Sequence, residues 1–155
     1  MKKSSLASSS FITYAVVALI LVGAGYMIVR WHGRPQLHDE SSFANINEVY
    51  TDHFHLDVRM NFQLQRLEGS NRLFLQTTAF FVSEVVLDVL ALDIFSVSNG
   101  DGRRLEWEVR DPNPALGQAL HISVPTVVFP GQTIELLIEF ATTNGTTAIS
   151  FLTPE

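Results

Sequence analysis

Histidines are the first residues in this sequence whose chemistry and spacing could build a site. Five are present: His32, His38, His53, His55 and His121. His53 and His55 are two residues apart in a strand-like stretch, so their rings point to the same side and could share a metal ion. The sequence offers no His-Glu-x-x-His helix, no cysteine and no third ligand at a zinc-motif spacing. We therefore expect solvent-facing histidines, with no metal site and no cofactor in this chain.

Paired carboxylates are the second candidate chemistry. Glu106 with Glu108, and Glu135 with Glu139, share the outward face of their predicted strands. Two such acids could act as a general acid and base, but charges on exposed strand faces also discourage edge pairing, and we interpret them in that way. Nucleophile elbows and glycine-rich phosphate loops are absent from the sequence, so no catalytic residue is assigned.

One modification site is predicted in a turn near the C-terminus. Asn144-Gly145-Thr146 is an N-glycosylation sequon, and Asn-Gly is typical of a tight turn. Asn144 is therefore a glycosylation candidate in a domain that faces an extracytoplasmic compartment.

The longest uncharged stretch decides whether the rest of the chain is tethered to a membrane. Residues 11–29 contain no charged residue and, as a helix, would be about 28 Å long, close to the thickness of a bilayer core. The sequence therefore predicts a transmembrane signal-anchor helix. A cleaved signal peptide ending near Gly23-Ala24-Gly25 is the alternative, although the apolar run is longer than a signal core. A buried core helix is a third interpretation, but such helices rarely are apolar on all faces at this length.

The anchor divides the chain into four predicted parts. Residues 1–10 form a cytoplasmic tail, residues 11–29 the anchor, residues 30–48 a stalk and residues 49–155 one β-domain. Two basic residues flank the anchor on each side, so the flanking charge does not decide its orientation. The short tail favours a single-pass type II protein with an extracytoplasmic domain, and secretion after signal cleavage is the alternative.

Charge and cysteine usage restrict the partners of the domain. Residues 39–155 contain sixteen acidic residues against six arginines, a net charge of −10, and no lysine. Nucleic-acid binding needs a basic face, so we expect no nucleic-acid partner. The sequence has no cysteine, which excludes a disulfide framework and a catalytic thiolate.

The domain has the periodicity of strands. From Phe54 onward, apolar and polar residues alternate, which predicts a half-buried strand whose apolar face carries Phe54, Leu56, Val58, Met60, Phe62 and Leu64. We expect a turn at residues 67–71 and a returning strand at residues 73–77. Further strands are predicted at residues 85–87, 92–97, 105–109, 120–124, 134–141 and 148–152, with a hairpin turn at 99–102. About seven or eight short strands without intervening helices predict an all-β fold, an antiparallel β-sandwich after a single N-terminal transmembrane helix.

Several short pieces occur in a characteristic order. They are His53-Phe54-His55-Leu56-Asp57-Val58, Leu67-Glu68-Gly69, Val85-Val86-Leu87-Asp88, Leu92-Asp93-Ile94, Pro130-Gly131-Gln132 and the final Ala148–Glu155, which ends in Leu-Thr-Pro-Glu. In this order, residues 53–155 resemble the N-terminal β-domain of the zinc aminopeptidases of the aminopeptidase N and leukotriene hydrolase family. Members of that family are often type II membrane proteins, which agrees with the predicted anchor.

The resemblance implies a fold and a role without a catalytic residue. In the family, the Gly-x-Met-Glu-Asn loop and the His-Glu-x-x-His zinc site with its downstream glutamate lie in a later domain, and this sequence ends at Glu155 before either motif. We expect a non-catalytic, membrane-anchored N-terminal domain of a metallo-aminopeptidase, with zinc only in the absent catalytic domain. The alternative is a stand-alone membrane-tethered β-sandwich for binding or adhesion, and an independent enzyme is the least favoured interpretation.

The expected partners follow from the same interpretation. They are the lipid bilayer through residues 11–29, and either a catalytic domain or a second copy of the chain. A domain that forms half of an interface should expose apolar side chains. The candidates on outward positions are Phe74, Leu137, residues 80–82 and Phe151-Leu152.

Overall fold

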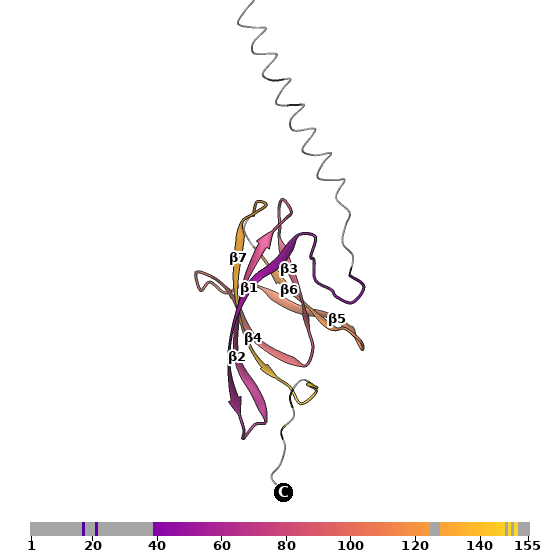
Figure 1. The fold of residues 1–155 in the computed structure, drawn as a ribbon, viewed down its shortest axis with the longest axis vertical. Helices are drawn as coiled ribbons and strands as arrows, with labels where there is room; N and C mark the ends of the chain where they lie inside the picture. Colours follow the sequence, from indigo (N-terminus) through magenta and orange to yellow (C-terminus); the bar gives the residue numbers. More distant parts are fainter. Residues whose placement is uncertain are drawn as a thin grey trace, which may run out of the picture. The chain divides into compact units, whose positions relative to one another are not determined.

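The computed structural model describes residues 17, 21, 39–124, 128–147, 149 and 151. Residues 39–151, where described, contain seven strands and no helix, and every pairing is antiparallel. The strands are β1 (Val49–Asn61), β2 (Arg66–Thr77), β3 (Glu84–Val89), β4 (Leu92–Asn99), β5 (Trp107–Asn113), β6 (Gly117–Ser123) and β7 (Thr133–Thr142). The predicted all-β antiparallel fold is confirmed (Figure 1).

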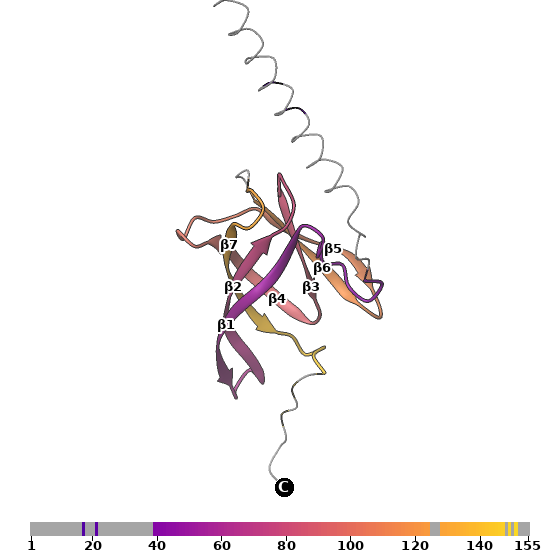
Figure 2. The same ribbon diagram turned by 45° about the horizontal axis from the view of Figure 1, so that its top comes forward.

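The strands form two sheets that share one core. A four-stranded sheet has the order β1-β2-β7-β4, and a three-stranded sheet has the order β3-β6-β5. Figures 1 and 2 show the smaller sheet on one side of the larger. Leu75 and Leu136 of the large sheet belong to the same buried cluster as Val85, Leu120 and Ile122 of the small one, and each is at most 1% exposed. Burial of these side chains holds the two sheets together.

The β1–β2 hairpin differs from the sequence prediction. The expected turn at residues 67–71 is wrong, because these residues lie inside β2 and pair with β1 on one side. The chain reverses instead at residues 62–65, where Gln65 has a φ of 50°. Gly69 accounts for the error: a Cβ there would lie 2.0 Å from the carbonyl oxygen of Asp57, so this glycine marks a close approach of two strands.

The chain changes sheets between β4 and β5. The predicted turn at residues 99–102 is confirmed, and Gly102 has a φ of 77°. The Leu105 amide still donates to the Val97 carbonyl at 2.9 Å, which continues the hairpin for a few residues. The following strand, β5, then pairs with β6 in the small sheet and not with β4. The predicted return strand at residues 105–109 therefore crosses to the other layer.

The segment before β1 is attached to the small sheet. The Ser42 hydroxyl donates to Asp88 Oδ2 at 2.6 Å. The Asn45 side chain donates to the Glu84 carbonyl and accepts from the Val86 amide, both at 2.9 Å. Asn45 thus replaces a neighbouring strand at the free edge of β3, and the predicted stalk, residues 30–48, includes a segment bonded to the folded domain.

Two predicted elements fall mainly outside the described residues. Residues 1–10 are not described, and of the predicted anchor helix, 11–29, only Val17 and Leu21 are, both with helical backbone. The described part of the chain holds no helix with the length and apolar character needed to cross a membrane. Of the predicted strand at residues 148–152, only Ile149 and Phe151 are described, and neither belongs to a strand.

Candidate interaction surface

The first strand carries an exposed row of apolar side chains. Cross-strand pairs place Phe54 beside Leu73 and Leu56 beside Asn71, so this row lies on the inner face of the large sheet, the face that holds the core. We call its members, which are 37–58% exposed, the β1 ridge: Phe54, Leu56, Val58 and Met60. Phe62 and Leu64 in the turn are 75% and 54% exposed.

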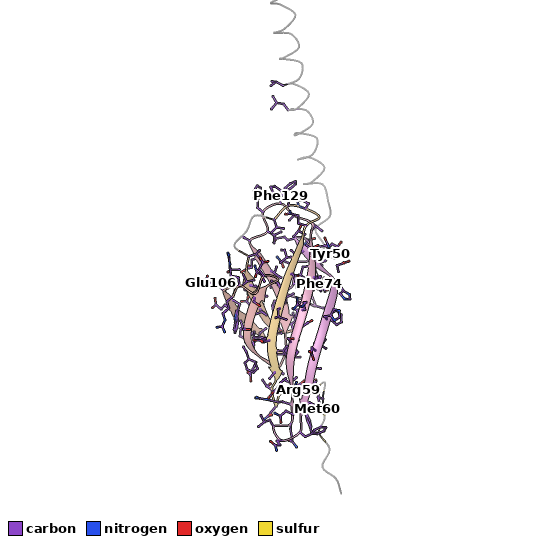
Figure 3. The ribbon with its side chains drawn as sticks, turned by 90° about the vertical axis from the view of Figure 1, so that its left-hand side faces the viewer. Tyr50, Arg59, Met60, Phe74, Glu106 and Phe129 are labelled. Carbon is purple, nitrogen blue, oxygen red and sulfur yellow. The ribbon has the colours of Figure 1, made fainter. Side chains whose placement is uncertain are left out.

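The predicted burial of this apolar face is therefore wrong, although the side chains do share one face of the strand as predicted. The small sheet has three strands, and the large-sheet residues buried against it lie mainly on β2 and β7. Figure 3 shows β1 at the outer side of the large sheet, beside β2 and then β7, with Tyr50 toward one end and Met60 toward the other. The ridge extends the core face beyond its cover, and a contiguous apolar surface of this kind normally marks an interface.

A small apolar pocket lies next to the ridge. Its volume is about 130 Å³, and it is lined by residues of both sheets, including Leu73, Ile94, Ile138 and Phe140. Asn71, which pairs with Leu56 of the ridge, also lines it, and its Oδ1 atom is buried without a hydrogen-bond donor. Oδ1 is already shielded from the surface of the domain, so this unpaired acceptor is a free-energy cost of the described fold and not a docking point.

The outer face of the large sheet is polar and mixed in charge. Asp57 and Arg59 of β1 line an open hollow with Glu68 and Glu139. Glu139 accepts a hydrogen bond from the Ser96 hydroxyl at 2.6 Å, and Glu135 is ion-paired with Arg72. The predicted pair Glu135/Glu139 is thus divided between two unrelated partners, which is the geometry of surface charges and not of an acid–base couple.

The carboxylates Glu106 and Glu108 also have different surroundings. Glu108 lies 2.7 Å from the Arg110 guanidinium, and this hydrogen bond lowers the pKa of Glu108 below its ordinary value. Glu106 is exposed and precedes β5, on the side of the small sheet (Figure 3). A carboxylate held in its charged form by an arginine is poorly suited to take up a proton at neutral pH.

The histidines do not converge on one site. His53 and His55 lie on exposed β1 with their rings edge to face, 5.3 Å between centroids. Across the described residues, no group of three or more His, Cys, Asp or Glu side chains is placed to hold a metal ion. His32 and His38 lie outside the described residues.

His121 is more buried than the sequence predicted. The pattern places it on an outward position, yet its side chain is only 16% exposed. Nδ1 lies 3.1 Å from a Glu84 carboxylate oxygen and Nε2 lies 3.5 Å from Asp111, but neither nitrogen makes a hydrogen bond of good geometry. His121 therefore joins the three strands of the small sheet through weak contacts.

The remaining predicted surface residues are partly confirmed. Asn144 lies in a turn with its side chain exposed, as a glycosylation acceptor requires, and the modification itself stays a prediction. Phe80, Phe81 and Phe129 are exposed at one end of the sandwich, with Phe80–Phe129 ring centroids 6.5 Å apart. Val82 is 2% exposed, so its predicted exposure is wrong.

The other surface candidates are intermediate. Phe74 and Leu137 on the outer face of the large sheet are partly exposed. Phe151 packs against Phe62 at the hairpin end, with ring centroids 6.5 Å apart, and Leu152 lies outside the described residues.

Comparison with known proteins finds relatives among leucine aminopeptidases and leukotriene A4 hydrolases. No protein-family model matches the chain. A leucine aminopeptidase 2 from Chaetomium globosum is 32% identical over 119 residues, which is 76% of this chain and 19% of that protein. A leucine aminopeptidase 2 from Neurospora crassa is 29% identical over 97% of this chain and 24% of that protein. The structure of leukotriene A4 hydrolase from Saccharomyces cerevisiae superposes with a TM-score of 0.64 at 24% identity. The match covers 74% of this chain and 18% of the hydrolase chain.

The part of these relatives that the chain matches is the N-terminal domain region of M1 zinc aminopeptidases and leukotriene A4 hydrolases.

The extent of the match defines what is shared. The chain spans about a fifth of the length of the aminopeptidases that it matches, so the similarity concerns one region of them. The likeness to the leukotriene A4 hydrolase structure shows the β-fold. The Neurospora match covers 97% of the chain, so it also includes most of residues 1–38. The predicted family resemblance is confirmed for the β-domain, while the membrane anchor stays a prediction.

Proposed function

We propose that this chain is the non-catalytic, membrane-anchored N-terminal β-domain of an M1-type zinc aminopeptidase. Hydrolysis of peptides from their N-terminus, and the zinc ion that it needs, belong to a catalytic domain that the aminopeptidase relatives carry in the rest of their length. The similarity to leucine aminopeptidases over three quarters of the chain carries this proposal. The domain's role is to pack against the catalytic domain and to help wall its cleft.

The uncovered inner face of the large sheet is the proposed contact with that catalytic domain. The β1 ridge is apolar, and the neighbouring pocket has room for an apolar side chain. A domain interface would bury the ridge and fill the pocket. The ridge and the pocket occur side by side, which is the pattern of one contact surface.

The experiment that tests this function reads the natural protein beyond Glu155. We expect mass spectrometry of the endogenous protein and sequencing of its transcript to find Gly-x-Met-Glu-Asn and His-Glu-x-x-His downstream. A natural protein that stops at Glu155, with neither motif nearby in the gene, would reject the aminopeptidase role and favour a stand-alone binding module.

The interface can be tested in that longer protein by two matched substitutions. Leu56→Asp places a charge on the ridge, whereas Asp57→Asn changes only the outer face of the same strand. We expect Leu56→Asp to lower aminopeptidase activity and to separate the domains in limited proteolysis, while Asp57→Asn leaves both unchanged. Equal behaviour of the two variants would show that the ridge does not contact the catalytic domain.

Membrane anchoring through residues 11–29 is part of the same proposal. The uncharged length of this segment supports it. We expect the chain to stay in membranes during alkaline carbonate washing and Asn144 to carry a glycan that a glycosidase removes. A mature N-terminus near Gly25 would instead show a cleaved signal peptide and a secreted domain.

A further inference from the structure

The free edge of β1 differs from the other sheet edges in the described residues. Asn45 covers the edge of β3, and a register shift follows Arg110 near the end of β5. On β4, a register shift follows Ile94 and Arg104 bridges Ser98. Such devices prevent unwanted strand pairing. β1 has its single shift near its start, between Thr51 and His53, and pairs regularly from there to its end.

The edge of β1 is open along its regular part. No strand in the described part of the chain pairs with its second side, so alternate amides and carbonyls of residues 53–61 face outward. This segment contains no proline, no lysine and no glycine. A long, regular edge with an apolar face is suited to antiparallel pairing with another strand.

The charges of β1 identify the strand that fits. Asp57 and Arg59 share the outer face, and neither makes an ion pair among the described residues. If two copies of β1 pair antiparallel about Val58, Asp57 of each copy lies opposite Arg59 of the other. A register shifted by one residue along each strand brings Asp57 opposite Asp57, or Arg59 opposite Arg59. Like charges directly opposite each other are unfavourable, so of these three registers the charges favour the one centred on Val58.

The apolar side of β1 agrees with the same register. Pairing about Val58 places Leu56 of each copy opposite Met60 of the other, and Val58 opposite itself. Registers in which the two residue numbers have an odd sum would instead put apolar side chains opposite charged ones. Pairing in this register therefore brings the apolar side chains of the two ridges side by side at the shared edge, and their inner-facing surfaces stay free.

We propose that two copies of this chain associate through β1, antiparallel and centred on Val58, to join their four-stranded sheets into one. The ladder comprises residues 55–61 of each copy, so the interface is modest and the dimer depends on concentration. The pairing uses the edge of β1, whereas the proposed catalytic-domain contact uses its inner face. The dimer therefore does not rest on the proposed aminopeptidase role.

Cysteine cross-linking tests the register in the full chain, which is free of natural cysteines. Val58→Cys places the two thiols directly opposite each other, within the Cα separation that a disulfide spans. Met60→Cys is the matched control on the same face, because two such positions would be roughly 13 Å apart along the ladder. We expect mild oxidation of the chain in detergent to cross-link Val58→Cys but not Met60→Cys.

A mixture of variants provides an internal check of the same register. Leu56→Cys and Met60→Cys chains, each unable to cross-link alone, should form a mixed disulfide because those positions lie opposite each other. Association through the apolar segment 11–29 would bring all of these positions together without distinguishing them. Cross-linking that is equal for Val58→Cys and Met60→Cys, or absent from both, would overturn the proposal.

Charge exchange tests the same contact without a covalent bond. In the Asp57→Arg dimer, the new arginine of each copy lies opposite Arg59 of the other, which gives two pairs of like charges. In the Arg59→Asp dimer, the new aspartate of each copy lies opposite Asp57 of the other in the same way. We expect each single variant to weaken association about tenfold in analytical ultracentrifugation of the full chain in detergent. The double variant restores opposite charges and should recover the dimer, provided that circular dichroism shows a native sheet in all three. Single variants that dimerise as well as the natural chain, or a double variant that stays monomeric, would refute the pairing.

Discussion

We expect that adding a single methyl group at Gly69, by substitution with alanine, forces β1 and β2 apart. Gly69 lies within β2, opposite Val58 of β1, and its φ is not in the left-handed region, so space and not backbone conformation requires glycine here. In Gly69→Ala, the new Cβ would be 2.0 Å from the Asp57 carbonyl oxygen and 2.7 Å from Val58 Cα. Both atoms belong to the backbone, so β1 must move away by about 1 Å or more to reach ordinary contact distances.

The size of the effect follows from the pairs that such a movement weakens. Val58 with Gly69 and the pairs on either side of it are displaced, which removes two or three ladder hydrogen bonds of about 0.5–1.5 kcal/mol each. The lower entropy of the unfolded alanine chain offsets about 0.4–1 kcal/mol. We therefore expect a net loss of about 1–3 kcal/mol and a fall of roughly 4–12 °C in the midpoint of thermal unfolding.

Thermal unfolding and amide hydrogen exchange of the full chain in detergent would measure this effect. Exchange should accelerate in β1 and β2 and stay unchanged in the small sheet, because β1 pairs only with β2 among the described strands. Gly100→Ala is the matched control, since a Cβ there would meet the flexible side chain of Glu135. A Gly69→Ala chain as stable as the natural one, with unchanged protection of β1, would refute the close-approach explanation.

Three further predictions concern the core, the covered edge and one ion pair. Leu136→Ala should lower the free energy of unfolding in urea by about 2–5 kcal/mol, because Leu136 is 0% exposed. Phe54→Ala on the exposed ridge should change the stability of the monomer by less than about 0.5 kcal/mol. Similar losses in the two variants would show that the ridge is buried. Asn45→Ala removes both hydrogen bonds at the β3 edge and should cost about 1–3 kcal/mol, and unchanged amide exchange in β3 would contradict this. The Arg110 hydrogen bond lowers the pKa of Glu108, so the small stabilisation from this exposed pair is present above the unfolded-state pKa and is lost as the pH falls through the folded-state value. In an NMR titration, Arg110→Gln should raise the pKa of Glu108, and an unchanged pKa would remove arginine as the cause.

Comparison of the predicted and observed strands shows which signals were reliable. The alternating segments at residues 92–97 and 134–141 became β4 and β7 with nearly the same bounds. Residues 67–71 were misassigned because glycine with polar neighbours indicates a turn in most sequences. Here the glycine serves the packing of β1 on β2, which depends on a neighbour far along the chain that no local pattern contains.

The candidate surface was the least predictable feature. Alternation in residues 54–60 identified which side chains share a face, but it could not show whether another layer covers that face. The predicted surface residue Val82 is buried, while Phe54 and Met60 are exposed. Exposure depends on the width of the opposing sheet, and this width follows from the crossover between β4 and β5, which assigns β5 to the small sheet.

The sequence by itself determined the class of the molecule. Period-two alternation, the absence of cysteine and the ordered pieces from His53 onward were sufficient for an antiparallel β-domain similar to the aminopeptidase N-terminal region, because strand periodicity and turn chemistry are local properties. Only the tertiary structure decided that Asn45 closes the β3 edge and that, among the described residues, β1 leaves its edge open and Asn71 Oδ1 lacks a donor. These features depend on which segments meet across long sequence separations, and the pairing of distant backbone groups is fixed only when the whole domain packs.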